Sequence, residues 1–361
     1  CALPIFVIER DGKTYRRTPE VLDCWFESGS MPYAQLHYPF ENKEVFEQGF
    51  PAEFIAEGLD QTRGWFYTLH AIATMIFDDV AYKNVVSNGL VLDKHGQKMS
   101  KRLGNAVDPF ETLAAFGPDA TRWYMIANAN PWDNLKFDIE GIAEVRRKFF
   151  GTLYNTYSFF SLYANIDEFT YAEEDVKLED RPEIDRWILS ELHTLIGKVD
   201  EFYNTYEPTR AARAISEFVQ ENLSNWFVRL SRRRYWKGEY AHDKISAYQT
   251  LYQCLVTVAK LGAPVAPFFM DRLYKDLNGL TNKEAAESVH LSDFPESNTA
   301  FIDTSLEHKM QKAQTISSLT LSLRAGFRCY LTVLRRRGRA ILAALRATAE
   351  VDVISLTQTV L

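Results

Sequence analysis

Residues 53–92, EFIAEGLDQTRGWFYTLHAIATMIFDDVAYKNVVSNGLVL, decide the fold of this chain. Glu53–Ala56 is predicted to form a short buried strand, Trp65–Ile76 an apolar helix, and Asn84–Ser87 a second strand that leads through Gly89 to another apolar run. Strand, helix and strand in this order form a βαβ unit of a parallel sheet, whose ligands bind beyond the carboxyl ends of the strands. We therefore expect the loops after these strands to hold the chemistry.

The second half of the chain has a different pattern. From about Glu140 it consists of long amphipathic stretches with apolar residues three and four positions apart, which predicts a helical bundle. The acidic residues 171–175 with Arg181-Pro182 are the predicted connection, and residues 262–267 are the predicted break inside the bundle. The fold class is therefore α/β followed by all-α. The clearest spacing is that of Ile184, Trp187, Ile188, Leu192 and Leu195.

The composition is that of a soluble globular chain. Its 361 residues are 46% hydrophobic and 14% aromatic, which is enough material for two or more domains. No apolar run is long enough to cross a membrane and no secretory signal is present, so we expect a cytoplasmic protein without a membrane partner. The formal net charge of -7 means that binding to nucleic acid would need a local basic surface. The chain opens with Cys1 and not with Met, which suggests that an upstream portion has been removed.

No metal site is predicted. The seven histidines have no partner at a metal-binding spacing, and the four cysteines form no C-x-x-C pair, which argues against a zinc site and against a disulfide framework. Each cysteine is instead predicted to be a small buried packing residue. The cysteines are Cys1, Cys24, Cys254 and Cys329.

A lysine loop, defined here as residues 93–105, follows the apolar run 90–92 and contains the sequence KMSKR at 98–102. Two lysines three positions apart, Lys98 and Lys101, could close on a triphosphate and neutralise the charge that moves onto a departing pyrophosphate. A bare K-x-S-K is common on protein surfaces, so a solvated loop is the alternative when the tetrapeptide is taken alone. The strand before it and the tail GNAVDP at 104–109 favour the nucleotide site.

An acidic block, EGLDQTRGWF at residues 57–66, follows the first predicted strand. Gly58 allows close backbone approach, while Glu57, Asp60 and Gln61 could bond an ammonium group and ribose hydroxyls. An ordinary acidic turn is the alternative.

Two tryptophans are candidates for the wall of an aliphatic pocket. Trp25 lies in the segment DCWFESGS at 23–30, and Trp65 lies in the acidic block. A rigid indole face discriminates shape rather than charge, although core packing explains either residue equally well.

A basic aromatic segment lies in the predicted bundle. The sequence NWFVR at 225–229 is followed by SRRRYW at 231–236. Arginines with interleaved aromatics can hold phosphates and stack on unpaired bases of RNA. The alternative is a solvated helix face pinned by core aromatics. The candidates for RNA contact are Arg232, Arg233, Arg234 and Trp236.

Taken together, these blocks resemble the class I aminoacyl-tRNA synthetases, and most closely their isoleucyl branch. Residues 98–102 resemble the KMSKS loop, residues 57–66 resemble the E-G-x-D-Q-x-R-G-W-F block of isoleucyl members, and residues 225–236 resemble a helix of the anticodon-binding domain. Residues 23–30 resemble the segment that returns the chain to the catalytic domain after its inserted domains. The resemblance runs from about Arg17 to Arg324.

The resemblance implies the second half of a Rossmann-like nucleotide-binding domain followed by an anticodon-binding bundle. The implied enzyme joins isoleucine to ATP, which carries Mg²⁺, and transfers the acyl group to tRNA(Ile). The implied catalytic residues are Lys98 and Lys101; the implied ATP-binding residues are Gly89, Val91 and Lys101; and the residues expected to bind isoleucine or its adenylate are Glu57, Gly58, Asp60, Gln61, Trp25 and Trp65.

The domains expected from the resemblance are an entry segment at 1–50, the catalytic half at 51–145, the bundle at 146–298, and a junction with an atypical arginine-rich tail at 299–361. Class I synthetases carry an H-x-G-H tetrapeptide, which this sequence lacks. We therefore expect this chain alone to be inactive. The alternatives are a catalytically incomplete tRNA-binding module, or a related synthetase of the valyl or leucyl type.

Overall fold

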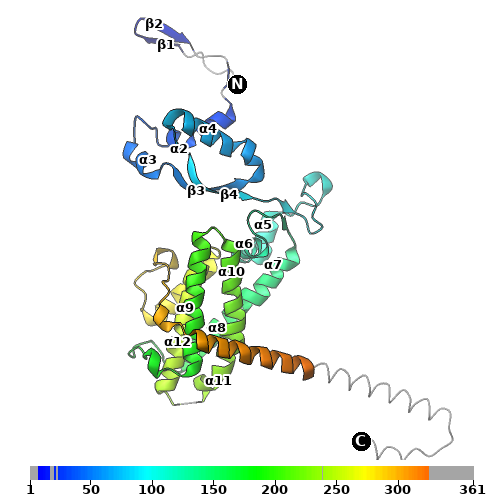
Figure 1. The fold of residues 1–361 in the computed structure, drawn as a ribbon, viewed down its shortest axis with the longest axis vertical. Coiled ribbons are helices and arrows are strands. Elements are labelled where there is room, and N and C mark those ends of the chain that lie inside the picture. The colour runs from blue at the N-terminus through cyan, green and yellow to red at the C-terminus, as the bar shows by residue number, and fades with distance from the viewer. Residues whose placement is uncertain (1–6, 17–19, 22, 238, 325–361) are drawn as a thin grey trace, which may run out of the picture.

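The computed structural model describes residues 7–16, 20–21, 23–237 and 239–324. Figure 1 shows a small α/β part toward the N-terminal end, a connecting region that contains α5, α6 and α7, and a long helical bundle below it. No helix in these ranges is both long enough and apolar enough to span a lipid bilayer.

The α/β part contains the predicted βαβ unit. Strands β3 and β4 pair in parallel from Ala52 opposite Tyr82 to Gly58 opposite Asn88, and helix α4 connects them. The prediction of strand, helix and strand is thus confirmed. The elements are β1 (Val7–Arg10), β2 (Lys13–Arg16), α1 (Cys24–Gly29), α2 (Met31–Ala34), α3 (Lys43–Gly49), β3 (Ala52–Gly58), the 3₁₀ helix η1 (Leu59–Arg63), α4 (Trp65–Phe77) and β4 (Tyr82–Asn88).

Strand β3 is less buried than its sequence predicts. Ile55 packs against the cluster that contains Leu69 and Ala73 of α4, but Phe54 on the opposite face is 45% exposed. The expectation of a buried strand is wrong here because the sheet has two strands and α4 covers one face of it. The ring of Phe54 instead stacks on Tyr206 of the helical part, with ring centroids 4.9 Å apart.

The connecting region begins with a second short parallel pair, β5 (Val91–Leu92) with β6 (Leu135–Lys136). The lysine loop lies between β5 and α5, and α5 begins where the Asp108 carboxylate accepts the backbone N–H of Phe110 at 2.7 Å. The other elements are the 3₁₀ helix η2 (Lys101–Leu103), α5 (Pro109–Phe116), α6 (Pro118–Asn128) and α7 (Ile139–Val145).

The bundle buries one large apolar core. The predicted stripe on α9 is confirmed, since Trp187, Ile188, Leu192 and Leu195 are buried and Ile184 is half-buried. Helix α12 lies at the centre and is buried along much of its length, as a helix surrounded by neighbours must be. The longer elements are the π-helical η3 (Arg146–Phe150), α8 (Gly151–Ile166), α9 (Glu183–Asn204), α10 (Pro208–Glu217), the π-helical η5 (Phe218–Val228), α11 (Arg229–Trp236), α12 (His242–Gly262) and α13 (Pro267–Thr281).

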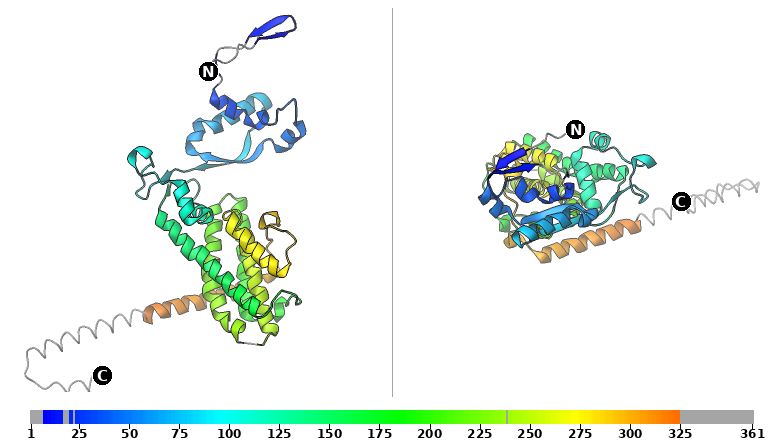
Figure 2. Two further views of the ribbon diagram at one scale, coloured as in Figure 1. Left: turned by 180° about the vertical axis from the view of Figure 1, so that it is seen from behind. Right: turned by 90° about the horizontal axis from the view of Figure 1, so that it is seen from above.

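The predicted connections in the bundle are also confirmed. Residues 167–182 connect α8 to α9 and contain the 3₁₀ helix η4 (Leu178–Asp180), and the predicted break separates α12 from α13. Two further 3₁₀ turns, η6 (Val289–Leu291) and η7 (Thr299–Phe301), lead to a helix over residues 304–324 that lies across the bundle (Figures 1 and 2).

The two cysteines that the structure describes differ in burial. Cys254 is buried as predicted, and burial raises the pKa of its thiol, but Cys24 is exposed, so its assignment to packing is wrong. Cys24 is the first residue of α1, a short helix whose only buried residue is Gly29. Cys1, Cys329 and the arginine-rich tail beyond residue 324 lie outside the described residues. The domain boundaries at residues 50, 145 and 298 stay predictions.

Candidate functional site

The acidic block lies at the carboxyl end of β3, where the βαβ unit predicts chemistry. Glu57 is exposed and lies opposite Ser87 of β4, and Gly58 ends the strand. A Cβ atom at Gly58 would lie 2.6 Å from the carboxylate oxygen Oδ1 of Asp60, so a larger residue here would displace that carboxylate. The Glu57 carboxylate is therefore presented at the strand end.

Gln61 has a structural role in the same turn. Its amide nitrogen donates to the Asp60 carboxylate at 3.1 Å, and its amide oxygen accepts the backbone N–H of Trp65 at 2.9 Å. Because Trp65 is the first residue of α4, this contact satisfies one of the N–H groups that a helix start leaves open. Gln61 thus connects Asp60 to the start of the helix.

The two predicted tryptophans lie on the packed helices α1 and α4 and differ in role. Trp65 is half-buried, and its indole N–H donates to the carbonyl oxygen of Ser28 at 3.1 Å, which fixes α1 to α4. Trp25 is 43% exposed, and its ring edge lies 3.3 Å from the position that a Cβ atom at Gly64 would take. The Trp25 ring thus lies against Gly64, the residue before Trp65, and Trp25 is the more exposed of the two tryptophans.

The lysine loop begins and ends at two polar side chains. Lys98 is exposed, and its backbone forms an isolated antiparallel bridge with Leu92. The side chain of Lys101 lies outside what the structure describes. Asp93 and Asn105 hydrogen-bond to each other at 2.9 Å across the base of the loop, a contact that sequence reasoning did not identify.

Gly89 has a clear packing reason. A Cβ atom at this position would lie 2.3 Å from the carbonyl oxygen of Asp133, and the Gly89 N–H donates to the carbonyl oxygen of Pro131 at 2.8 Å. Val91 follows in β5, where it is 41% exposed and pairs with Leu135. Close packing against the Asp133 backbone thus accounts for Gly89, and the expected role of Gly89 and Val91 in ATP binding stays a prediction.

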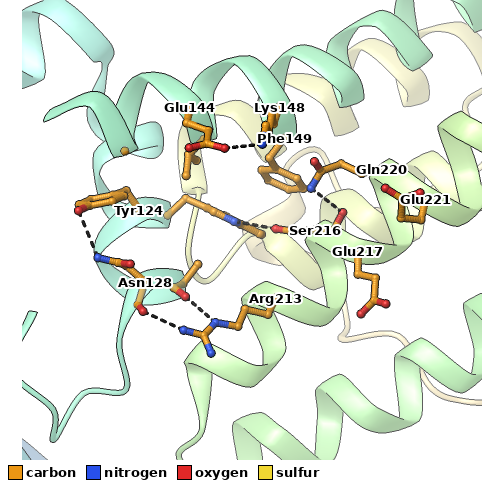
Figure 3. A pocket seen from close by; sticks show the side chains of 14 residues that line it. Tyr124, Asn128, Glu144, Lys148, Phe149, Arg213, Ser216, Glu217, Gln220 and Glu221 are labelled. Carbon is orange, nitrogen blue, oxygen red and sulfur yellow. Dashed lines mark hydrogen bonds and ion pairs between the residues drawn. The ribbon is translucent and has the colours of Figure 1, made fainter. Parts of the chain in front are cut away.

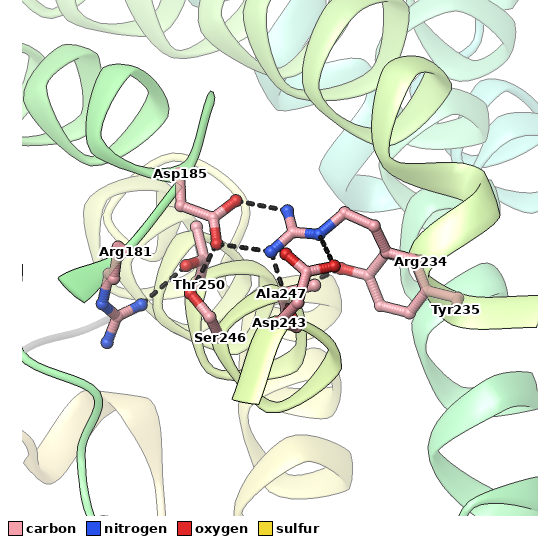
Figure 4. A network of polar contacts seen from close by, with 8 residues as sticks. All are labelled: Arg181, Asp185, Arg234, Tyr235, Asp243, Ser246, Ala247 and Thr250. Atoms are coloured by element: carbon pink, nitrogen blue, oxygen red, sulfur yellow. Dashed lines mark hydrogen bonds and ion pairs between the residues drawn. The ribbon is translucent and has the colours of Figure 1, made fainter. Parts of the chain in front are cut away.

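The basic segment on α11 divides into two faces. Figure 4 shows the guanidinium group of Arg234 turned inward onto Asp185, with contacts of 2.5 and 2.8 Å. Asp243 accepts from the same guanidinium at 3.0 Å, and Asp185, which is fully buried, also accepts the Ser246 hydroxyl at 2.6 Å. Burial disfavours the charge of Arg234, but the Asp185 carboxylate outweighs this effect and raises the pKa of Arg234 above its ordinary value.

Arg234 is therefore occupied inside the bundle, which corrects its place among the candidates for tRNA contact. Arg232 and Arg233 are exposed, and Trp236 is 50% exposed. Tyr235, between them in sequence, is buried and donates its hydroxyl to the carbonyl oxygen of Ala247 at 2.9 Å. One face of α11 is thus fixed by a buried aromatic side chain, as the alternative interpretation expected, and the opposite face is exposed.

A groove lies beside α11. It has a volume of about 770 Å³ and is enclosed on one side by η5 and α11 and on the other by the helix over residues 304–324. Its lining includes Asn225, Trp226 and Arg229 from the first side and Thr315 and Ser318 from the second. Sequence reasoning found the first side by its motif but had no signal for the second.

Another cavity, of about 540 Å³, lies between α6, α7 and α10 (Figure 3). Several of its polar groups hold neighbouring helices together. Arg213 donates to the carbonyl oxygens of Ala127 and Asn128 at 2.7 and 2.8 Å, and the indole N–H of Trp123 donates to Ser216 at 3.0 Å. None of the residues predicted for the site lines this cavity.

Among the residues that the structure describes, no group of three or more His, Cys, Asp or Glu side chains is placed to hold a metal ion. The expected absence of a zinc site stays a prediction.

Two family models match separate regions of this chain. Residues 4–138 match the family model of tRNA synthetases class I (I, L, M and V), and residues 185–330 match that of the anticodon-binding domain of tRNA ligase. The chain belongs to the class I tRNA synthetases. The predicted α/β part and helical part of this synthetase chain thus correspond to the two matched family regions.

Curated relatives of this synthetase chain are isoleucine-tRNA ligases. The protein of Bacteroides fragilis is 64% identical over 322 residues, which cover 89% of this chain and 28% of the relative. That of Thermus thermophilus is 48% identical, over 87% of this chain and 30% of the relative. The chain therefore spans less than a third of the length of these curated relatives.

Solved structures show the same fold. The Agrobacterium radiobacter K84 agnB2 LeuRS-tRNA-LeuAMS ternary complex matches with a TM-score of 0.63 and 20% identity, over 83% of this chain and 36% of that one. A methionyl-tRNA synthetase of Mycobacterium tuberculosis bound by methionyl-adenylate matches with a TM-score of 0.58 and 20% identity, over 70% of this chain and 49% of that one. At this level of identity the match supports the class I synthetase fold.

Proposed function

We propose that this chain is a segment of an isoleucine-tRNA ligase and that it supplies the second half of the aminoacylation site together with a tRNA-binding bundle. One observation carries the proposal: the parallel pairing of β3 with β4 places Glu57 and Gly58 opposite Ser87 and Asn88. The acidic block therefore begins at the same edge of the sheet at which β4, the strand that leads to the lysine loop, ends. A ligand site in a parallel sheet requires this arrangement. The similarity to isoleucine-tRNA ligases supports isoleucine as the amino acid.

The first reaction is adenylation. A carboxylate oxygen of isoleucine attacks the α-phosphorus of ATP, the bond from that phosphorus to the bridging oxygen of the β-phosphate breaks, and pyrophosphate leaves. Mg²⁺ would accompany ATP and offset part of its negative charge. The ammonium groups of Lys98 and Lys101 neutralise the charge that develops on the leaving group. The exposed Glu57 carboxylate accepts hydrogen bonds from the ammonium group of isoleucine, and the open face of Trp25 contacts its aliphatic side chain.

The second reaction is transfer to tRNA. A hydroxyl oxygen of the terminal ribose of tRNA attacks the acyl carbon of the adenylate, the bond from that carbon to the phosphate oxygen breaks, and AMP and the hydroxyl proton are released. The exposed face of α11 binds the tRNA through Arg232, Arg233 and Trp236, because guanidinium groups pair with phosphates and indoles stack on unpaired bases. The groove beside α11 extends this surface with amide, hydroxyl and indole groups that can bond base edges.

The test uses a chimeric enzyme, in which this chain replaces the matching segment of the Bacteroides fragilis isoleucine-tRNA ligase. The chimera is expected to catalyse isoleucine-dependent exchange of pyrophosphate into ATP, with leucine and methionine as inactive controls. This chain alone is expected to show no exchange, because orientation of the reacting groups accounts for roughly 7–11 kcal/mol of such a barrier and this segment holds one part of the site. Exchange that does not depend on isoleucine would refute the proposal.

A second candidate is a tRNA-binding module without catalysis. It is favoured by the exposed basic face of α11, which is complete within this chain. Binding of labelled tRNA(Ile) by this chain, combined with a chimera that shows no pyrophosphate exchange, would select this candidate. Binding combined with exchange selects the ligase.

A further inference from the structure

Asp93 organises the first half of the lysine loop. One oxygen of its carboxylate accepts the backbone N–H groups of His95 at 2.9 Å and Gln97 at 2.8 Å. Its own backbone N–H donates to the carbonyl oxygen of Gln97 at 2.8 Å, and Gly96 completes this turn with a positive φ of 82°. The carboxylate thus satisfies the backbone of a tight turn that comes directly after β5.

Asn105 organises the second half of the loop, twelve residues further along the chain. Its amide oxygen accepts the backbone N–H of Ser100 at 2.9 Å, and its amide nitrogen donates to the carbonyl oxygen of Lys98 at 3.3 Å. The same amide nitrogen donates to the second carboxylate oxygen of Asp93 at 2.9 Å. Both oxygens of Asp93 and both polar atoms of Asn105 are therefore engaged, and they connect both halves of the loop to one point.

We infer that Asp93 and Asn105 are positioning residues for adenylation. The pair, called here the loop clasp, holds the backbone of residues 93–105 in one shape before ATP binds, so that the two lysine positions approach the triphosphate as one unit. This inference rests on the proposed function for its role in the reaction. Its physical basis is that a loop already ordered in the free protein loses less conformational entropy when it closes on its ligand.

The same hydrogen bonds would be present if the loop clasp served only the local fold. The test therefore swaps the side chains of Asp93 and Asn105, singly and together. In Asp93→Asn, one amide oxygen can still accept from the turn, but the new NH₂ group faces the NH₂ group of Asn105. In Asn105→Asp, the carboxylate can still accept from Ser100 but faces the Asp93 carboxylate. The double variant Asp93→Asn/Asn105→Asp restores a donor opposite an acceptor between the two side chains, while the longer contact of residue 105 with the Lys98 carbonyl oxygen stays lost.

A matched control lies on the neighbouring turn. Asp133 accepts from the amide nitrogen of Asn130 at 2.9 Å, and Asp133 is exposed. The variant Asp133→Asn therefore makes the same Asp-to-Asn change at an Asp-Asn contact of the same length outside the lysine loop.

The first measurement is amide hydrogen exchange on this chain, which needs no enzyme activity. We expect the Ser100 and Gln97 amides to exchange about tenfold faster or more in each single variant, and to return to within about threefold of the original rate in the double variant. The control variant is expected to leave both amides unchanged. Unchanged exchange at Ser100 in both single variants would show that no loop clasp exists in solution.

The second measurement is steady-state pyrophosphate exchange by the chimeric enzyme. Each single variant is expected to lower kcat about tenfold or more with the KM for isoleucine unchanged, and the double variant is expected to recover most of the loss. Faster amide exchange with unchanged kcat would overturn the positioning role while the proposed function stands. If the unmodified chimera shows no pyrophosphate exchange, the proposed function and the catalytic role of the loop clasp are both refuted. The amide hydrogen-exchange rates would still decide whether the loop clasp exists.

Discussion

Replacing Asp185 by alanine is expected to destabilise the helical bundle by about 3–5 kcal/mol, the usual cost of removing one partner from a buried ion pair. Asp185 is fully buried and accepts two hydrogen bonds from Arg234 and one from Ser246, at distances between 2.5 and 2.8 Å. Its removal leaves a guanidinium that is 14% exposed without this partner, and Asp243, which is 60% exposed, compensates weakly. The expected loss of stability is therefore that of a buried ion pair and not that of an exposed one.

The assay is urea unfolding of this chain, followed by circular dichroism at the helical signal. The matched control is Arg272→Ala, which removes an Arg-Asp pair of similar length, 2.9 Å to Asp276, from a site where the arginine is 79% exposed. Exposed pairs of this kind contribute about 0–1 kcal/mol, so the two variants should differ by several kcal/mol. A loss of stability for Asp185→Ala within about 1 kcal/mol of the control would refute the structural role given to Arg234.

Three further predictions concern ligand binding and the loop. The double variant Arg232→Ala/Arg233→Ala is expected to weaken tRNA binding and to reduce the slope of log Kd against log salt by about 1 to 2. Arg272→Ala is the control, and an unchanged slope in the double variant would indicate that this face of α11 is only solvated. The backbone N–H of Gln97 and then the Asn105 amide lower the pKa of Asp93, and the charge of His95 lowers it further. Protection of the Ser100 amide from exchange should therefore be complete above the ordinary aspartate pKa and be lost as the pH falls through the lowered pKa. Amide exchange against pH tests this sign, and protection that rises on acidification would contradict it. In the chimeric enzyme, Lys101→Ala is expected to lower the adenylation rate about 100-fold or more without changing tRNA affinity, and equal rates would remove the lysine from the mechanism.

Local sequence pattern was sufficient for the elements that carry the site. The apolar run at 65–76 and the strands on either side were found because their periodicity and their order along the chain express the βαβ unit directly. The stripe that contains Trp187 and Leu195 was found in the same way. The extent of burial was harder to predict, because the exposure of Phe54 depends on how many strands the sheet has and not on the strand itself.

The site's polar contacts could not be predicted, since they join residues far apart in the chain. Arg234 was assigned to RNA because its neighbours are basic and aromatic, whereas its partner Asp185 lies 49 residues earlier on α9. Asp93 and Asn105 carry no motif that marks them as a pair, and only the turn of the loop brings them together. Motif position thus identified the loops, and tertiary structure determined which of their side chains are free to act.

The most direct test of the proposed active site is the affinity of the chimeric enzyme for a non-hydrolysable isoleucyl-adenylate analogue, measured by calorimetry before and after Glu57→Ala. A charged hydrogen bond between the Glu57 carboxylate and the ammonium group of the ligand predicts a loss of about 10- to 100-fold in affinity. The loss should be smaller for an analogue that lacks this ammonium group. Equal affinity of the two proteins for the complete analogue would contradict the placement of the amino acid at the carboxyl end of β3.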